Sequence, residues 1–240
     1  MTRVSIVIPA RNEAGNIVAL VEAIDAALAR LAPFEIIVVD DGSTDATIPV
    51  LTDRARTLPH LRIIRHDRSG GQSAAVHTGV LAARAPIVAT LDGDGQNPPE
   101  ELPNLLAPLL ADPTGRVGLV AGQRVGRKDT WSKRMASRLA NILRVWLLRD
   151  GTRDTGCGLK AFRREAFLAL PYFNHMHRYL PALFVRDGWQ IVHVDVTHRP
   201  RGAGLSNYSN LQRAIVGVPD LLGVMWLSRR RKTARPVNPE

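Results

Sequence analysis

The chain has 240 residues, 45% of them hydrophobic and 22% charged, which is enough for one α/β domain with a full core and short for two. Its single cysteine, Cys157, excludes an internal disulfide. The net charge of +10 is unevenly spread, because residues 1–120 carry a net −4 and residues 121–240 a net +14. A basic excess in one half favours contact with polyanions, whether nucleic acid, anionic lipid or substrate phosphates.

The first half alternates strand-like and helix-like segments. Apolar, β-branched runs predict strands at residues 3–9, 34–41, 61–66, 86–92 and 118–122. Helical patterns follow the first four strands, at residues 16–31, 43–55, 70–83 and 98–110, with Ser43 or Thr44 placed to cap the second helix. Short apolar strands separated by helices predict a parallel sheet that is buried on both faces. The opening "MTRVSIVIP" is strand-like and contains no signal-peptide pattern, so we expect a cytoplasmic location.

Polar clusters follow three of these strands: "PARNE" after the first, "DDGSTD" after the second and "DGDGQ" after the fourth. Ligands of open α/β sheets bind at the carboxyl ends of the strands, so the three clusters predict one shared site. Asp92 and Asp94 stand one residue apart in a glycine turn that can present both carboxylates. Hard cations such as Mg²⁺ and Mn²⁺ take one or two carboxylates and fill their remaining positions with substrate phosphates. A plain polar turn is the alternative for "DGD" alone.

Two common nucleotide-binding signatures are missing from the sequence. No "GxGxxG" follows the first strand, and "GxxxxGK[ST]" does not occur. A dinucleotide-binding fold and a phosphate-loop NTPase therefore lose their main support.

Basic residues gather on one predicted helix of the second half, residues 131–149. Met135, Leu139, Ile142 and Trp146 follow helical spacing, while Arg134, Ser137, Arg138 and Asn141 form a second row on another face. That row is either a solvated face or a phosphate-binding face, and the second reading requires the helix to lie near the aspartate site.

An apolar segment near the C-terminus, residues 215–227, is too short to cross a bilayer, which takes about 20 apolar residues. The basic run of residues 229–232 adjoins it. Two readings remain open: a helix lying at a membrane interface, or a helix docked on the core. Residues 233–240 are predicted to be disordered.

Several motifs occur together in a fixed order: "SIVIPARNEAGNI", "IIVVDDGSTDAT", "GGQSAAVHTGV", "TLDGDGQNPPEEL", "GQR", "DTGCGLKAFRR" and "HRPRGAGLSNYS". In this combination, over residues 4–209, the chain resembles family 2 glycosyltransferases. Within that family it is similar to the polyprenyl-phosphate group, which includes the dolichyl-phosphate mannosyltransferases and the undecaprenyl-phosphate sugar transferases. The resemblance implies an α/β fold of the GT-A type, with a mostly parallel central sheet flanked by helices. Expected domains are 1–212 for the GT-A domain, 213–232 for an amphipathic C-terminal helix that is either interfacial or docked on the core, and 233–240 for a disordered tail.

The resemblance also implies roles for individual residues on the donor side. Pro9, Arg11, Glu13 and Asp41 would bind the nucleotide, and Asp92 the nucleotide-sugar. Asp94, assisted by Gln96, would hold Mg²⁺ or Mn²⁺ on the diphosphate, which makes Asp92 and Asp94 the candidate catalytic residues. The family usually has an aromatic residue where Arg11 stands, and more often alanine where Gly93 stands.

On the acceptor side, the resemblance implies a phosphate site formed by Arg124, Lys133, Arg134, Ser137 and Arg201. Arginine forks suit phosphate oxygens. A phosphate monoester is already anionic near neutral pH, so no general base is assigned, whereas a sugar hydroxyl would ordinarily require one. His77, His175 and His177 match no metal-site spacing and are given no ligand role, and Cys157 is not proposed as a reactive thiol.

The implied function is a metal-dependent, inverting transfer of a sugar such as mannose or glucose from a nucleotide-sugar donor to a polyprenyl phosphate. The protein would act as a peripheral enzyme on the inner face of the cytoplasmic membrane. One alternative is a family 2 enzyme that glycosylates a saccharide or protein hydroxyl. A more remote one is a non-catalytic basic protein that binds membrane or nucleic acid. Nucleic acid is disfavoured because the few aromatic residues do not interleave with basic ones.

Overall fold

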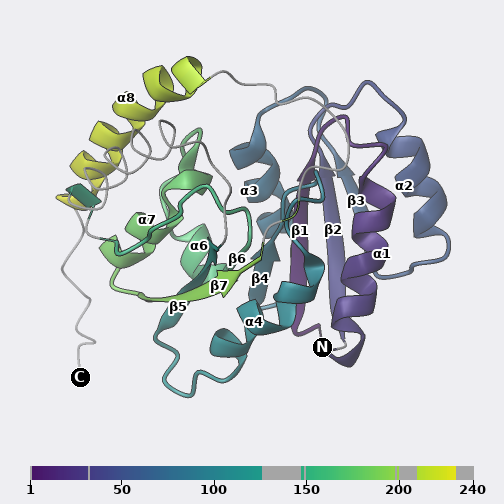
Figure 1. The fold of residues 1–240 in the computed structure, drawn as a ribbon, viewed down its shortest axis with the longest axis horizontal. Coiled ribbons are helices and arrows are strands. Elements are labelled where there is room, and N and C mark those ends of the chain that lie inside the picture. The colour runs from purple at the N-terminus through teal and green to yellow at the C-terminus, as the bar shows by residue number, and fades with distance from the viewer. Residues whose placement is uncertain are drawn as a thin grey trace, which may run out of the picture.

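The computed structural model describes residues 2–31, 33–125, 147–148, 150–197, 199 and 210–230, with the side chains of residues 210–216 left out (Figure 1). The basic helix predicted at residues 131–149 lies outside these residues, apart from Leu147 and Leu148, which are helical. The predicted tail, residues 233–240, also lies outside them.

One mixed sheet runs through the described part of the chain, with the strand order β3-β2-β1-β4-β6-β5-β7. The strands are β1 Val4–Ala10, β2 Phe34–Asp40, β3 Leu61–Arg65, β4 Ile87–Thr90, β5 Val117–Arg124, β6 Lys160–Arg163 and β7 Gln190–Val196. Strands β1 to β4 are mutually parallel, and β5 is parallel to β7. Strand β6 alone among them is inserted antiparallel between β4 and β5. The predicted mostly parallel sheet is confirmed.

Helices cover both faces of the sheet (Figure 1). One face packs against α1 Ile17–Leu28, α2 Thr47–Ala55 and α4 Leu102–Leu110. The other packs against α3 Gln72–Ala82, α6 Arg164–Leu168, α7 Leu180–Arg186 and α8 Asn210–Ser228. Short 3₁₀ turns lie at η1 Ala29–Leu31, η2 Pro99–Glu101 and η3 Met176–Arg178.

The alternation of side chains along β1 explains why its sequence is mainly apolar, with the buried Ser5 hydroxyl paired to Glu35. Ile6 and Ile8 are buried in the cluster on the α1 side, while Val7 between them is buried on the α3 side. Successive side chains of a strand point to opposite faces, so a sheet covered on both faces needs apolar residues at every position.

The predicted strands of the first half match β1 to β5, and the helices after them match α1 to α4. The expected helix cap at Ser43 or Thr44 is wrong, because α2 begins only at Thr47. Both residues instead hold the neighbouring loop: Ser43 Oγ accepts a hydrogen bond from the Asn12 N–H, and the Thr44 N–H donates to Asn12 Oδ1. Asp45 accepts from the Thr47 N–H in their place.

The strand order places a crevice beside β1. Strand β2 pairs with one side of β1 and β4 with the other, so the chain winds in opposite directions from this strand. In open α/β sheets, the carboxyl ends of strands at such a reversal are where ligands bind. The clusters "PARNE", "DDGSTD" and "DGDGQ" all follow strands that meet at this edge.

Helix α8 packs on the second face at the end of the molecule away from α1 and α2 (Figure 1). Val224 is fully buried there, with Leu221 and Met225 beside it. The Tyr179 hydroxyl donates to the Gly217 carbonyl at 3.1 Å, and Arg186 Nε donates to the Leu227 carbonyl at 3.0 Å. No helix in the described part of the chain has the length and apolar content needed to cross a bilayer. The division predicted at residue 212 falls inside α8 and stays a prediction.

Helix α3 approaches β1 most closely at Gly79. A Cβ atom at this position would lie 2.3 Å from Val7 Cγ1 and 3.2 Å from Val39 Cγ2. Both neighbours are stiff β-branched side chains in the core, so they cannot move aside easily. The absence of a side chain at Gly79 therefore sets the spacing between α3 and the sheet.

We expect Gly79→Ala to lower the free energy of unfolding by about 1–3 kcal/mol, the usual cost of overpacking a core. Gly223 in α8 is the matched control, because a Cβ there meets nothing within 4 Å. Gly223→Ala should be neutral or stabilising by up to about 1 kcal/mol through helix propensity alone. Denaturant unfolding of the two variants measures both effects. Equal free energies of unfolding for the two variants would contradict the close packing at Gly79.

Candidate active site

Two loops at the carboxyl edge, after β1 and β2, are tied together by side-chain hydrogen bonds. Besides the Asn12 contacts above, the Glu13 N–H donates to Thr47 Oγ1 at 2.9 Å and the Ala14 N–H to Asp45 Oδ2 at 3.2 Å. Asn12 adopts a left-handed backbone conformation, with φ of 54°, which lets the chain turn back toward the second loop. The two motifs predicted to bind the nucleotide thus form one surface.

The predicted nucleotide-binding residues lie along this surface. Pro9 is at the end of β1 and also lines the pocket described below. Arg11 is exposed to solvent, and Glu13 accepts a hydrogen bond from Asn16 Nδ2 at 2.7 Å. The structure brings these residues to one edge, and their contacts with a nucleotide stay a prediction.

Asp41, at the end of β2, organises the loop that leads from β3 into α3. Its carboxylate accepts hydrogen bonds from Ser69 Oγ at 2.6 Å and from the N–H groups of Gly70 and Gly71 at 2.8 and 2.9 Å, and it contacts His66 Nδ1 at 2.8 Å. Burial alone would raise the pKa of this carboxyl, but the hydrogen bonds lower it below its usual value. Asp41 is thus a buried, ionised carboxylate that holds the loop before α3 at the carboxyl edge of the sheet. Its contact with a nucleotide stays a prediction.

Asp92, just after β4, is held from two sides. Gln72 Nε2, from the first turn of α3, donates to Asp92 Oδ1 at 2.7 Å, and Asn97 Nδ2 donates to Oδ2 at 3.4 Å. Burial, followed by repulsion from Asp94, raises the pKa of Asp92, while Lys160 pulls the other way. The predicted catalytic aspartate therefore has a fixed orientation before any ligand binds.

Asp94 lies in the same turn, where Gly95 has a positive φ of 71° and lets the chain fold back. The Gln96 N–H donates to Asp94 Oδ1 at 3.1 Å, so the two predicted metal ligands are neighbours. No group of three or more His, Cys, Asp and Glu side chains gathers as metal ligands among the described residues. Two neighbouring carboxylates that repel each other still suit a divalent cation whose remaining ligands are phosphate oxygens and water.

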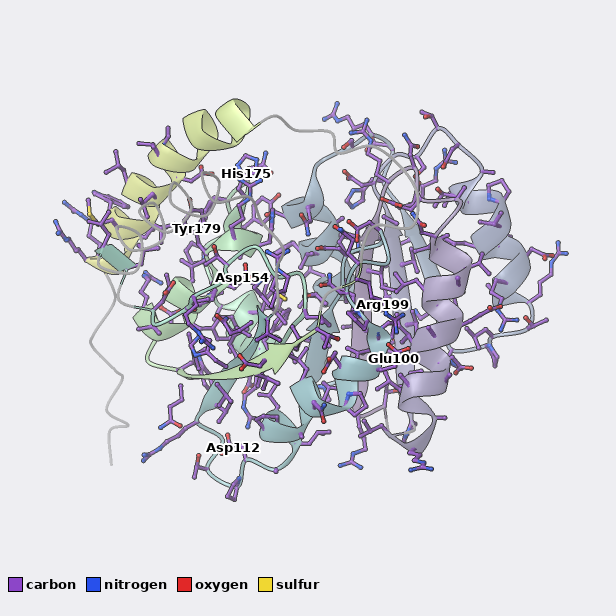
Figure 2. All side chains as sticks on the ribbon, in the orientation of Figure 1. Glu100, Asp112, Asp154, His175, Tyr179 and Arg199 are labelled. Carbon is purple, nitrogen blue, oxygen red and sulfur yellow. The ribbon has the colours of Figure 1, made fainter. Side chains whose placement is uncertain are left out.

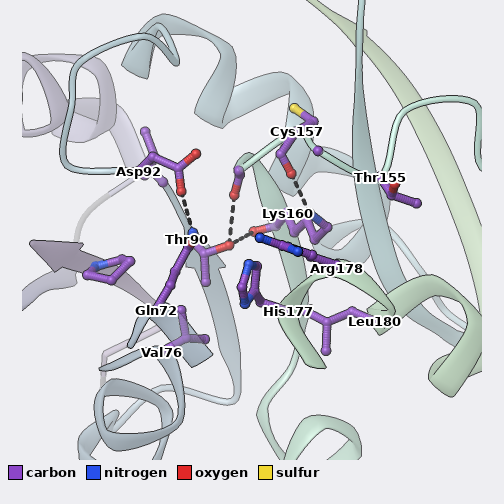
Figure 3. Close-up of a pocket in the computed structure, with 14 residues that line it drawn as sticks. Gln72, Val76, Thr90, Asp92, Thr155, Cys157, Lys160, His177, Arg178 and Leu180 are labelled. Carbon is purple, nitrogen blue, oxygen red and sulfur yellow. Dashed lines mark hydrogen bonds between the residues drawn. The ribbon is translucent and has the colours of Figure 1, made fainter. Parts of the chain in front are cut away.

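A pocket of about 330 Å³ opens beside Asp92, between α3, the loop before β6 and the segment before α7 (Figure 3). Its charged lining consists of Asp92, Lys160 and Arg178, and His177 lies beside Arg178 in the view of Figure 3. Lys160 is the first residue of β6, opposite Thr90 of β4 in the antiparallel register. The insertion of β6 therefore brings a lysine to the aspartate site from a distant part of the sequence.

Lys160 and His177 are both held in a buried environment. Lys160 is 5% exposed, and its Nζ donates to the Cys157 carbonyl. Burial lowers the pKa of Lys160, while Cys157, Asp92 and Asp154 oppose that shift. Burial, followed by the positive charges of Arg178 and Lys160, lowers the pKa of His177 well below its usual value. His177 Nδ1 lies 2.7 Å from Ser73 Oγ of α3, which fixes the ring.

Arg124, the predicted acceptor-phosphate residue at the end of β5, forms a two-pronged ion pair with Asp154. Nε lies 2.5 Å from Oδ2 and Nη2 lies 2.8 Å from Oδ1. The hydrogen bond to Asp154 raises the pKa of Arg124. Gln123 fixes the partner, because its Oε1 accepts the N–H groups of Arg153 and Asp154. Asp154 belongs to the loop that also supplies Cys157 to the pocket (Figures 2 and 3).

The chain after β7 returns to the aspartate loop. The Arg199 N–H donates to the Gln96 carbonyl at 3.0 Å, and Arg199 Nη2 lies 3.1 Å from Glu100 Oε2 (Figure 2). Thr197 donates to Glu101 through both its N–H and its hydroxyl. The other predicted acceptor residues lie outside the described residues, and their roles stay predictions: Lys133, Arg134, Ser137 and Arg201.

Four residues of this site were not predicted from the sequence: Gln72, Lys160, His177 and Arg178. Of these, His177 was considered only as a metal ligand and was given no such role. One signal was available for Lys160, which stands between the apolar residues of "CGLKAF". A lysine inside an apolar strand is buried only when its charge has a partner, so this pattern marks a special position. Cys157 is a buried free cysteine that lines the pocket.

Residues 5–170 match the model of glycosyl transferase family 2. The chain belongs to this family. The match covers both sides of the site, from β1 through the Asp92 turn to Lys160 of β6.

Relatives within the family act on polyprenyl phosphates, according to their names. The chain is 35% identical to dodecaprenyl-phosphate galacturonate synthase of Rhizobium johnstonii, over 97% of this chain and 68% of the relative. It is also 35% identical to undecaprenyl-phosphate 4-deoxy-4-formamido-L-arabinose transferase of Pectobacterium carotovorum, over 87% of this chain and 63% of the relative. The chain thus spans about two thirds of the length of these proteins.

Solved structures of the GT-A type share the fold. Glucosyl-3-phosphoglycerate synthase of Mycobacterium tuberculosis, in complex with Mg²⁺ and UDP, superposes with a TM-score of 0.70 at 20% identity. The superposition covers 95% of this chain and 79% of that protein. The same synthase with Mn²⁺, UDP and phosphoglyceric acid also gives 0.70, at 21% identity, over 95% and 78% of the two chains. The expected GT-A fold of this family 2 glycosyltransferase is confirmed.

Gly158 allows Asp92 to occupy its position. A Cβ atom on Gly158 would lie 2.3 Å from Asp92 Oδ2 and 2.4 Å from its Cγ. We therefore expect Gly158→Ala to displace the Asp92 carboxylate and to lower the rate of sugar transfer by about tenfold or more, as misplacement of a catalytic group does. Steady-state transfer rates and the melting temperature are measured together, to separate loss of the site from loss of the fold.

The control for this prediction is the Asp92→Asn background. If Gly158→Ala acts through Asp92, its effect on the rate should largely vanish in the double variant, because two changes on one contact are not additive. An undiminished effect in that background would contradict the assignment.

Proposed function

We propose that the chain is a cation-dependent, inverting glycosyltransferase that moves a sugar from a nucleotide-sugar donor to a polyprenyl phosphate. The observation that carries the proposal is the fixed Asp92 carboxylate beside Asp94 at the reversal of the strand order. Membership of glycosyl transferase family 2 supports the reaction class, and the names of the relatives support the polyprenyl-phosphate acceptor.

The donor would lie across the carboxyl edge of the sheet. Its nucleotide would follow the surface made by the loops after β1 and β2, where Pro9, Arg11, Glu13 and Asp41 lie. Its diphosphate would then lie at Asp92 and Asp94. Its sugar would enter the pocket, which a donor extending from β2 reaches after it passes Asp92. The order of the strands supports this direction, since β2, β1, β4 and β6 follow one another across the sheet.

Asp94 and Gln96 would hold Mg²⁺ or Mn²⁺ against the diphosphate. The chemistry supplied by such a cation is the neutralisation of the charge that develops on the departing nucleoside diphosphate. The repulsion between Asp92 and Asp94, which raises the pKa of Asp92, would be relieved by a cation at this position. The Mg²⁺ and Mn²⁺ complexes of the structural relative with UDP agree with this chemistry.

The acceptor would attack without a base. A phosphate oxygen of the lipid forms the new bond to the anomeric carbon, and the bond from that carbon to the diphosphate oxygen breaks with its electron pair. Attack from the opposite face inverts the configuration of the carbon. The acceptor phosphate is already ionised near neutral pH, so no proton has to be removed from it. Arg124 would bind it in competition with Asp154, together with Lys133, Arg134, Ser137 and Arg201.

A transfer assay tests the proposal. Labelled nucleotide sugars are incubated with the protein, a divalent cation and a polyprenyl phosphate, and the label that enters the organic phase is counted. We expect transfer from one donor of the panel, and a loss of at least about 100-fold in Asp94→Asn at saturating Mn²⁺ or Mg²⁺. Near wild-type transfer by Asp94→Asn would overturn the cation assignment. No label in the organic phase with any donor would point to a hydroxyl acceptor.

The outer face of α8 would hold the protein to the membrane that contains its acceptor. Val218, Leu222 and Trp226 follow one another at intervals of four and are 59, 52 and 55% exposed. Arg229 and Arg230 follow at the end of the helix, and the Arg230 guanidinium lies 4.9 Å above the Trp226 ring. Apolar and aromatic side chains beside basic ones are typical of helices that lie in the interface of an anionic bilayer. The inner face of the helix is already covered by the core, so only this outer stripe remains for lipid.

We expect the double variant Leu222→Ser and Trp226→Ser to bind vesicles of phosphatidylcholine and phosphatidylglycerol about tenfold more weakly, because it loses apolar surface from the interface. Leu81→Ser is the matched control, since Leu81 is 53% exposed on α3 and lies outside α8. Vesicle co-sedimentation measures the partitioning. Equal binding by wild type and double variant would contradict this membrane-facing role.

A further inference from the structure

The pocket beside Asp92 has more positive than negative charge in its lining. Lys160 and Arg178 are its cations and Asp92 its one carboxylate among the described residues. His177 adds no charge near neutral pH, because burial and the two neighbouring cations lower its pKa well below the usual value.

Arg178 is the cation of this pocket that lacks a partner within the described part of the chain. Its backbone N–H donates to the His175 carbonyl, but its guanidinium forms no ion pair with the described carboxylates. Lys160, by contrast, bonds the Cys157 carbonyl and interacts with Asp92. In Figure 3 the Arg178 guanidinium extends into the pocket, toward Thr90 and Lys160. A half-buried guanidinium without a counter-charge calls for an anion from a ligand.

We infer that this pocket selects a donor sugar that carries a carboxylate, a uronic acid, and that Arg178 binds that carboxylate. The inference rests on the proposed function, which places the sugar of the donor in this pocket. A planar guanidinium can grip a carboxylate through two parallel hydrogen bonds, which a neutral hydroxymethyl group cannot form. The buried Lys160 adds electrostatic attraction for the sugar carboxylate. The hydrogen bond from Gln72 holds the Asp92 carboxylate toward α3.

The position of Arg178 and its charge both support its assignment to the sugar carboxylate. The diphosphate of the donor is held at the Asp92 and Asp94 turn, so a negative group on the sugar has to be balanced separately, farther into the pocket. The η3 turn, which carries Arg178 and is joined to α3 through the contact of His177 with Ser73, supplies that balance. A neutral sugar would leave the Arg178 charge uncompensated in a partly buried position, which is unfavourable. Specificity of this kind comes from a polar group of the site that only the right substrate satisfies.

The test compares donors that differ only in the group on C5 of the sugar. UDP-glucuronate is paired with UDP-glucose and UDP-galacturonate with UDP-galactose, each in the transfer assay and in calorimetric binding without acceptor. We expect one uronate to have a kcat/KM at least about tenfold above that of its neutral partner, given the usual strength of hydrogen bonds to charged groups. Preference for a neutral sugar would overturn the inference and leave the proposed function intact. Transfer from none of the four would count against both.

Arg178→Gln tests the residue itself. It should lower kcat/KM for the uronate by about 10- to 100-fold and leave the neutral partner within about threefold, while Arg178→Lys recovers part of the loss. Arg116→Gln is the charge control, because Arg116 is exposed before β5 and does not line the pocket. An equal loss for both donors would mean that Arg178 binds the diphosphate or the acceptor, and would overturn the assignment. Melting temperatures of the three variants exclude unfolding as the cause.

Discussion

The site depends on the electrostatic coupling of Asp92, at the end of β4, with the buried Lys160 at the start of β6, whose Nζ is held by the Cys157 carbonyl. A lysine that is 5% exposed would be unfavourable without an opposite charge nearby, and Asp92 supplies it. The antiparallel pairing of β4 with β6 sets the two residues on the same edge of the sheet. Hydrogen bonds from Gln72 and Asn97 then fix the Asp92 carboxylate. The fold thus provides a carboxylate whose orientation does not rely on a bound ligand.

The two halves of the site differ in how they are built. On the side of β1 and β2, loops are joined by hydrogen bonds among small polar groups, as around Asp41 and Asn12. On the side of β6 and α7, the walls are packed side chains that carry positive charge. The first arrangement suits a nucleotide, which offers many hydrogen-bonding groups, and the second suits an anionic substituent.

Much of the fold could be predicted from local sequence patterns. The strands that could not be predicted lack such a pattern, for a physical reason. Strands β1, β2 and β4 are buried along almost their whole length, so each reads as a mainly apolar run, and the shorter β3 still has three apolar residues out of five. Strand β7 lies at the edge of the sheet and alternates exposed and half-buried residues, and β6 has only four residues, so neither has that signature. For the same reason, the aspartates of the "DGDGQ" turn could be predicted from strand ends, whereas Lys160 reaches the site through the pairing of β6 and Arg178 through the packing of η3 against α3. Their proximity depends on tertiary contacts that no local pattern encodes.

The insertion of β6 also has a consequence for the order in which the chain acquires its structure. Strands β1 to β4 pair through successive parallel units that close as soon as each helix is in place, while β6 must wait for a segment that begins at Lys160. At the usual rate of about 5–20 residues per second, the ribosome delivers that segment roughly 3–14 seconds after β4. During this interval the edge of β4 that β6 will cover has no partner. A nascent chain would therefore pair β1 to β4 first, and the edge of β4 would be covered only when the antiparallel strand β6 joins the sheet.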